Sequence, residues 1–480
     1  MRKTFEPQLQ FGAIPIEEVK IPLRSRHEVP AVVRALQAIH CNKEMNQKVF
    51  AILSDKIIGN KKQTGRPGMD LWHILVLGIL RLATNSNYDE LEHYANYDRL
   101  IRQIMGIDNV FDEHQIGFSY NALRDNICQF DEDMLKQIND IIVDYGHKLV
   151  KKKEHEKLQI KVDSYVLEST VHFPTDINLL YDASRKCIEI IANTSPEYNL
   201  KGWRKFADWK QRIKNLMRSL SKTAFNGGKN KEERLQGETS KYIEIVETLS
   251  DKVLETILEL YNRNYESKEL NYFYDMQLKH IDLIRRRMIN KETIPADDKV
   301  FSLFETYTEW LNKGKQGGKI ELGVKLLVAT DQYDLIVDYQ LMNNQVDLDQ
   351  TIPVADRLLT KFGSDSIGSI SYDKGFSKFG NKELLETYIP KVILDKRGKL
   401  NKIEQEAQQD KVYKKLRYAH SAIESNINCL EHHGLDKCPD KGEKSFRRYT
   451  GFGILAYNLH KIGNILIAED KKKLLQKKTG

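Results

Sequence analysis

The hydrophobic period of the sequence changes several times, and these changes separate helical from strand-forming stretches. Apolar residues recur at helical spacing in the first 150 residues and again from about 195 to 295. A strand-like alternation replaces this spacing from Lys157 to His172, and strand patterns return after residue 320. The order predicts an α/β fold: a mixed sheet flanked by helices, with an N-terminal all-α part and an α-helical insertion.

The N-terminal segment predicts short helices joined by tight turns. The turn signal Gly65-Arg-Pro-Gly68 precedes Asp70, which stands at the expected N-cap of an apolar run. Further helices are predicted over 88–95, 98–105, 119–129 and 131–150. The pattern is compatible with a helix-turn-helix-like module for the major groove of DNA, although any small helical domain gives the same pattern.

The second half predicts the remaining parts of the sheet. Strands are expected over 320–329 and 335–341, with a hairpin through Asp331-Gln332, and over 367–372 and 391–394. A helix is expected over 347–362, and C-terminal helices are expected around residue 424 and over 446–466.

The insertion predicts three amphipathic helices with a break at Gly227-Gly228. Their near-heptad stripes suit either an intramolecular core or a dimeric coiled coil, and we expect the core. The stripes are formed by Phe206, Trp209, Ile213, Leu216 and Leu220, then Val246, Leu249, Val253, Ile257 and Leu260, then Leu270, Tyr274, Ile281, Ile284 and Met288.

Two aspartates follow runs that predict buried strands. Asp163 comes after Leu158-Gln-Ile-Lys-Val162, and Asp373 comes after Ile367-Gly-Ser-Ile-Ser-Tyr372. We therefore expect both acids at strand ends, where a sheet exposes its side chains. Taken singly, each acid is as easily an ordinary strand-end or turn residue.

A helix predicted within 419–434 carries a third carboxylate, Glu424, beside an apolar stripe made of Ile423, Ile427 and Leu430. Three carboxylates that converge would form an all-oxygen site suited to Mg²⁺ or Mn²⁺. Two such ions about 3.5–4 Å apart stabilise the entering and leaving oxygens of an in-line phosphoryl displacement.

The order Asp, Asp, Glu, together with the short sequence motifs around these residues, here called words, resembles the DDE transposases of bacterial insertion sequences. Six words in one order are far more specific than any single acid, and they extend over nearly the whole chain. The words are KVDSYVLESTVHFPTDINLLYDASR (161–185), EWLNKGK (309–315), ELGVKLLVATDQYDLIVDYQ (321–340), SYDKGF (371–376), HSAIESNINCLEHHGLDKCPDKG (420–442) and FRRYTGFGILAYNLHKIG (446–463).

The resemblance implies a ribonuclease-H-like catalytic domain in which Asp163, Asp373 and Glu424 are catalytic and hold two Mg²⁺ or Mn²⁺ ions. It implies DNA cleavage at the ends of an insertion sequence, strand transfer into target DNA, and a homo-oligomer on DNA. The expected parts are an N-terminal helical DNA-binding domain (1–150), the first part of the catalytic domain (151–194), the insertion (195–300), the second catalytic part (301–467) and a basic tail (468–480).

The residues around the third acid depart from the family's pattern. Many relatives have Tyr and Arg before the glutamate, at the spacing Y-x₂-R-x₃-E, and Lys seven residues after it. Here Arg417, His420 and Glu431 occupy these positions, so those phosphate contacts cannot be carried over unchanged. Arg417 and His420 are candidate substitutes, and Lys325 and Lys374, inside two of the shared words, are further candidate DNA contacts.

Positive charge gathers in the insertion. Between residues 201 and 234 there are eleven Lys/Arg and three Asp/Glu, a local charge of +8, whereas the whole chain carries only +7. Such a cluster is typical of a protein with a polyanionic partner, although a solvated helix face is the simpler alternative. The interleaved aromatic residues Trp203, Phe206 and Trp209 favour DNA. The candidate DNA contacts here are Arg204, Lys205, Lys210, Arg212, Lys214 and Arg218.

Other chemistry has weaker support. The spacing C-x₂-H-H-x₄-C, from Cys429, His432, His433 and Cys438, is compatible with zinc, but ordinary buried or solvent-facing residues are the preferred interpretation. The sequence has no phosphate loop of the G-x-x-x-x-G-K-[ST] or G-x-G-x-x-G type. Five scattered cysteines, no apolar export signal and no long apolar run predict a cytoplasmic protein without a membrane partner. The family resemblance implies that this protein is nucleoid-associated.

Two alternative functions stay open. One is a DNA-binding protein without catalysis, such as a domesticated transposase that acts as a repressor. The other is a hydrolytic nuclease on the same fold, which uses identical metal ligands. The presence of all three acids argues against the first alternative and does not separate the second.

Overall fold

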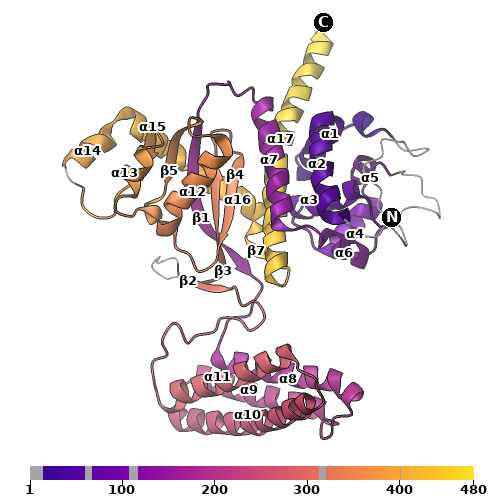
Figure 1. The fold of residues 1–480 in the computed structure, drawn as a ribbon, viewed down its shortest axis with the longest axis vertical. Helices are drawn as coiled ribbons and strands as arrows, with labels where there is room; N and C mark the ends of the chain where they lie inside the picture. Colours follow the sequence, from indigo (N-terminus) through magenta and orange to yellow (C-terminus); the bar gives the residue numbers. More distant parts are fainter. Residues whose placement is uncertain (1–13, 60–67, 108–116, 313–319, 401, 480) are drawn as a thin grey trace. The chain divides into compact units, whose positions relative to one another are not determined.

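The computed structural model describes residues 14–59, 68–107, 117–312, 320–400 and 402–479. The chain forms two compact units: one contains Met1–Thr170 and Leu311–Gly480, and the other contains Val171–Trp310 (Figure 1). Residues 313–315 of the EWLNKGK word and all but the last residue of the turn Gly65-Arg-Pro-Gly68 lie outside the described residues.

The first unit is built on a mixed sheet. In the described residues the sheet has seven strands, with β2-β3-β1-β5-β6 as the main order, while β4 pairs with β3 and β7 pairs with β1. Strand β1 is antiparallel to β3 and parallel to β5. The strands are β1 (Leu158–Ser169), β2 (Glu309–Asn312), β3 (Ile320–Thr330), β4 (Ile336–Met342), β5 (Ile367–Tyr372), β6 (Lys391–Ile393) and β7 (Lys437–Cys438).

Helices of the second half of the chain flank this sheet. Helix α12 (Asp347–Phe362) packs its apolar side against one face, where Val354 and Leu358 join a core with Val162 and Ile370. The expected mixed sheet flanked by helices is confirmed. The other elements here are η4 (Lys374–Phe376), α13 (Asn381–Glu386), α14 (Lys402–Gln409), α15 (Lys411–His420), α16 (Ala422–Leu430) and η5 (Glu431–Leu435).

The N-terminal helices pack against the last helix, α17 (Glu443–Thr479), with α1 (Glu28–Cys41) and α7 (Glu132–Leu149) alongside it (Figure 1). The approach is close, because a Cβ at Gly463 would lie 1.8 Å from the Ala31 carbonyl oxygen, so only glycine fits. These helices therefore share a compact unit with the sheet, and no division falls at the expected boundary of 150. Residues 468–479, expected as a tail, continue α17.

The helices predicted after Asp70 lie at the right places, whereas the two helices over 28–41 and 43–53 were not predicted. Asp70 occupies the N-cap of α3, but its side chain makes no capping hydrogen bond. The helices are α1 (Glu28–Cys41), α2 (Lys43–Leu53), α3 (Leu71–Ala83), α4 (Tyr88–Tyr97), α5 (Arg99–Ile104), α6 (Tyr120–Ile127) and α7 (Glu132–Leu149), with the short turns η1 (Ile16–Glu18) and η2 (Ser54–Ile58). None of the described helices is long and apolar enough to cross a membrane.

The second unit is a bundle of four long helices. These are α8 (Asp176–Tyr198), α9 (Phe206–Phe225), α10 (Lys231–Asn262) and α11 (Lys268–Ile284), followed by η3 (Arg285–Ile289). The predicted stripes pack into one core, so the intramolecular interpretation is confirmed, except that Phe206 is exposed. The unit begins at Val171 because α8 packs with α9 and α11, whereas the expected boundary was residue 195.

Candidate active site

Asp163 and Asp373 lie on neighbouring parallel strands. The pairing of β1 with β5 ends at Val162 and Tyr372, so the next positions in the same register are Asp163 and Asp373. Paired residues of a parallel ladder point to the same face, which brings the two carboxylates side by side. Asp373 is exposed directly after β5, as predicted, and accepts a hydrogen bond from the backbone N of Gly375 at 3.3 Å.

The prediction that Asp163 ends its strand is wrong. Strand β1 continues to Ser169, and Asp163 pairs with Val328 of β3 in the middle of that ladder. Only the pairing of β1 with β5 ends at this point. Asp163 is half-buried, and its Oδ1 accepts a hydrogen bond of 2.7 Å from the backbone N of Ser164. The carboxylate is thus oriented by the rigid strand that carries it.

Glu424 lies in the first turn of α16 and is exposed. The adjoining side of this helix buries Ile423 and Leu430, while Ile427 is half-buried, so the predicted apolar stripe is present. Helix α16 contacts β1. Glu424 is therefore carried by an element that packs against the strand of Asp163.

The pKa of Asp163 depends on charges that these neighbouring elements carry. Burial raises the pKa of its carboxyl group, and the nearby charges of Asp373, Asp347 and Glu424 raise it further, whereas the hydrogen bond from Ser164 lowers it. The resulting pKa is about 7. Three acids from three other parts of the chain therefore act on this one carboxyl group, and a cation among them would stabilise its ionised form.

Asp347 was not identified from the sequence, yet it belongs to this group. Its Oδ1 accepts a hydrogen bond from Ser164 Oγ at 2.7 Å, and its Oδ2 lies 2.7 Å from Lys325 Nζ. A Cβ built on Gly375 would lie 3.6 Å from an oxygen of Asp347 and 3.6 Å from an oxygen of Asp373. The N-terminus of α12 thus adds a fourth carboxylate and pairs Lys325, a candidate DNA contact, with it.

The remaining candidate contacts near the acids differ in what they touch. His420 Nδ1 hydrogen-bonds Ser371 Oγ at 3.0 Å, and burial lowers its pKa although Asp373 and Glu424 raise it. Arg417 pairs with buried Asp395 at 3.0 Å. Lys374 is exposed beside Asp373. His420 and Lys374 therefore lie beside the acids, while the charge of Arg417 is partly used within the protein.

The chemistry of these donors fits Mg²⁺ or Mn²⁺, because carboxylate oxygens are the ligands that hard cations prefer. The crowding of negative charge on Asp163 is the observation that favours a cation here. Among the described residues, however, no three His, Cys, Asp or Glu side chains lie close enough together to hold one ion. The charges of the other acids therefore all act on Asp163, but the acidic side chains must come closer together before they can bind one ion.

The candidate zinc ligands are engaged elsewhere. His432 Nε2 lies 2.9 Å from a carboxylate oxygen of Glu28, and buried His433 hydrogen-bonds His460 at 3.2 Å. Cys429 is exposed and Cys438 is buried. In the part of the chain that the structure describes, these residues form no metal-binding group.

The basic candidates of the helical unit lie on or just before α9. Arg204, Lys205, Arg212 and Arg218 are exposed, and Lys214 is half-buried. Lys210 is ion-paired with Glu189 at 2.8 Å, so part of its charge is neutralised.

The tryptophans that favoured DNA contact are mainly core residues. Trp203 is buried and donates a hydrogen bond to Thr256 at 2.9 Å, and Trp209 packs against the same core. Neither ring is free to stack fully on a base. Phe206 is the exposed aromatic residue of the three, with 43 % of its surface accessible.

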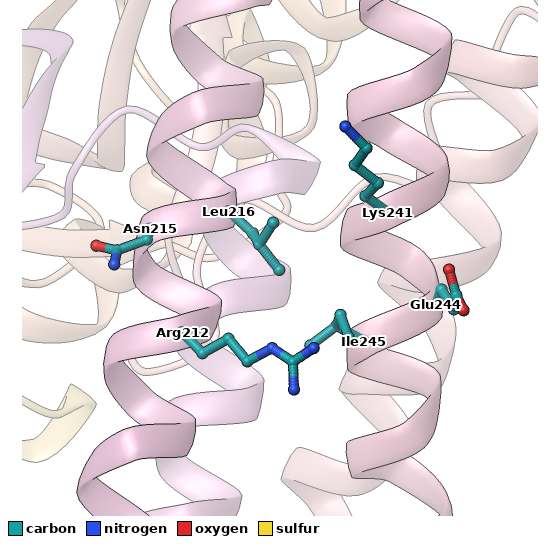
Figure 2. Close-up of a pocket in the computed structure, with 6 residues that line it drawn as sticks. All are labelled: Arg212, Asn215, Leu216, Lys241, Glu244 and Ile245. Carbon is teal, nitrogen blue, oxygen red and sulfur yellow. The ribbon is translucent and has the colours of Figure 1, made fainter.

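An open groove of about 440 Å³ lies between α9 and α10. Leu216 lies in the space between the helices, Arg212 reaches across it towards Ile245, and Lys241 leans into it from α10 (Figure 2). Glu244 points away on the far side of α10 (Figure 2). The groove therefore has an apolar floor beneath two cationic side chains.

Comparison with protein-family models, with curated proteins and with solved structures finds no match to this chain.

Proposed function

We propose that the chain is a DDE transposase that cuts DNA at the ends of its element and joins them to target DNA. The observation that carries the proposal is that the nearby charges of Asp373, Asp347 and Glu424 all raise the pKa of Asp163. Raised carboxyl pKa values beside like charges are typical of sites that bind cations or perform catalysis. The resemblance of the surrounding words supplies the reaction class.

The strand pattern supports the ribonuclease-H-like part of the proposal. Along β4-β3-β1-β5-β6, β3 is antiparallel to both of its neighbours, β4 and β1, and the last two strands run parallel to β1. This order and these directions are what we expect of a ribonuclease-H-like sheet. Asp163 on the central strand and Asp373 after its parallel neighbour also agree with the expected places of two catalytic acids.

In this proposal Asp163, Asp373 and Glu424 hold two Mg²⁺ or Mn²⁺ ions. The ions would supply activation of the attacking oxygen and stabilisation of the leaving 3′ oxygen. Asp163 must lose its proton to serve as a ligand, and Ser164 orients the carboxylate through its backbone N–H. His420, oriented by Ser371, can donate a hydrogen bond from its other ring nitrogen to a neighbouring phosphate oxygen.

The helical unit is proposed to hold DNA phosphates. Arg212 and Lys241 over the groove, with Lys214 and Arg218 on α9, provide cations outside the helical core. Contacts of this kind give affinity without reading sequence. Recognition of the element's ends is therefore assigned to other residues.

The test is incubation of the full chain with Mg²⁺ and duplex DNA that carries the terminal sequences flanking its own gene. Joined products support transposition. Nicked products without joined products support the hydrolytic nuclease, and binding of these ends without either product supports the repressor. A chelator should abolish both products.

A further inference from the structure

Lys161 and Asp163 emerge on the same face of the sheet, because they are two residues apart on β1. Lys161 is only 7 % exposed, and its Nζ lies 2.9 Å from Oδ1 of Asp334. A buried ammonium group is costly unless an anion is beside it. Asp334 thus stabilises the strand that carries Asp163 at the point nearest to the acids.

Asn426 connects the same carboxylate, Asp334, to the helix that carries the third acid. It follows Glu424 by two residues on α16, is 2 % exposed, and donates from Nδ2 to Oδ1 of Asp334 at 3.2 Å. A single carboxylate oxygen of Asp334 therefore receives a hydrogen bond from β1 and another from α16. This oxygen links the two elements that present Asp163 and Glu424.

Asp334 itself is held in the turn between β3 and β4. Its backbone has φ +60°, and its carbonyl accepts a hydrogen bond from Tyr457 of α17 at 3.0 Å. Earlier in the same turn, buried Asp331 accepts a hydrogen bond from the backbone N of Leu335 at 3.0 Å and bonds His147 of α7 at 2.6 Å. The turn is thus anchored to two long helices, so Asp334 is a fixed point.

We propose that Asp334 is a positioning residue that fixes the separation of Asp163 and Glu424 and thereby sets the affinity of the acidic site for divalent cations. The inference rests on the proposed function of that site. Partners outside the ligand set orient metal ligands, and removing them typically costs about 10–100-fold in metal affinity or activity. Asp334 acts on both acids at once through Lys161 and Asn426.

The test measures Mn²⁺ binding to the full chain by electron paramagnetic resonance, without DNA. Asp334→Asn keeps the shape and an acceptor for Asn426 but leaves Lys161 without its anion, so we expect about 10-fold or greater weakening of Mn²⁺ affinity. The matched control is Asp338→Asn in the same hairpin, which removes an ion pair of 2.8 Å with Arg357 of α12. The control should bind Mn²⁺ as the native chain does.

A second variant separates positioning from folding. Asn426→Ala keeps the Lys161–Asp334 ion pair, and it replaces Asp334→Asn if that variant does not fold. It should weaken Mn²⁺ binding and speed amide hydrogen exchange in α16. The double variant should lose less free energy of Mn²⁺ binding than the sum of the losses in the two single variants, because both changes break the same link.

Two results would overturn the inference in distinguishable ways. If both single variants fold and bind Mn²⁺ with native affinity, even at lower thermal stability, then Asp334 has a purely structural role. Absence of Mn²⁺ binding by the native chain removes the metal site itself, and with it both the proposed function and this role.

Discussion

The ammonium nitrogen of Lys325 lies 2.7 Å from Oδ2 of Asp347, so the acidic group has a cation of its own. Ser164 binds the other oxygen of Asp347 at 2.7 Å. This arrangement offsets one of the negative charges around Asp163 before any metal arrives. It also means that Lys325 is engaged within the protein, and a role in holding DNA would require it to leave Asp347.

We predict that Asp163→Asn, Asp373→Asn and Glu424→Gln each abolish DNA cleavage while folding is kept. Each change removes a ligand charge with little change of shape, and loss of several kcal/mol of transition-state stabilisation corresponds to about 10²–10³-fold in rate. Cleavage is scored on the element's end DNA, with Glu383→Gln as an exposed acidic control. Near-native cleavage by any of the three variants would remove that residue from the catalytic set.

Asp347→Asn is predicted to lower the pKa of Asp163 from its value of about 7, because the charge of Asp347 is one of the causes that raise it. Carbon-13 NMR of aspartate carboxyl groups, recorded without metal, measures the change. Asp349→Asn is the matched control, since this acid lies on the same helix and pairs with Lys378 at the surface. An Asp163 pKa that responds equally to both changes would contradict the assigned neighbourhood.

The pH dependence follows from the same group. The carboxyl group of Asp163 titrates near 3.8 when unfolded and near 7 when folded, so between these values the folded state binds the extra proton. Without metal, stability should therefore fall as pH rises from about 4 to 7, by roughly 4 kcal/mol from this group. Chemical denaturation at several pH values, compared between the native chain and Asp163→Asn, isolates this contribution.

Metal binding should be coupled to the same proton. Since the ionised form is the ligand, binding of Mn²⁺ near pH 6 should release about one proton, and binding near pH 8.5 almost none. Calorimetry in two buffers of different ionisation enthalpy counts the proton. Equal proton release at both pH values would show that Asp163 is not the group displaced.

Sequence reasoning located most elements and three of the four acids because it depends on local patterns. Asp373 was placed correctly since Lys374-Gly375 marks a turn, whereas Asp163 was misplaced because continuation of β1 depends on pairing with β3. Asp347 lies 183 residues from its partner Ser164. No local pattern connects these two residues, since their contact is created by the packing of α12 on the sheet.

The helical unit shows the same limit. The spacing of its apolar stripes predicted a core, but it did not show which aromatic residues face inward. Trp203 is buried because α9 and α10 close over it, and its indole nitrogen is satisfied by Thr256. Likewise, the sequence analysis placed most of α8 in the first part of the catalytic domain, and only the contacts of α8 with α9 and α11 assign it to the bundle.

The last prediction concerns the cations of α9. Arg212→Gln, Lys214→Gln and Arg218→Gln together should flatten the dependence of log K on log salt for duplex DNA by about 0.9 for each phosphate that is no longer neutralised. Binding should weaken alike for all sequences, because phosphate contacts carry no sequence information. Lys210→Gln alone should have a smaller effect, since Lys210 is already paired with Glu189.

A charge-matched control separates local contacts from a general reduction of positive charge. Lys268, Lys279 and Lys299 lie in the same helical unit outside α9; Lys268 and Lys299 are exposed, and Lys279 is half-buried, as Lys214 is. Changing them to Gln removes three charges as well, and it should leave the slope much closer to that of the native chain. If both triple variants have the same slope, net charge rather than this face determines binding. If neither variant departs from the native slope, the duplex is held elsewhere, and the N-terminal helices are the next region to test.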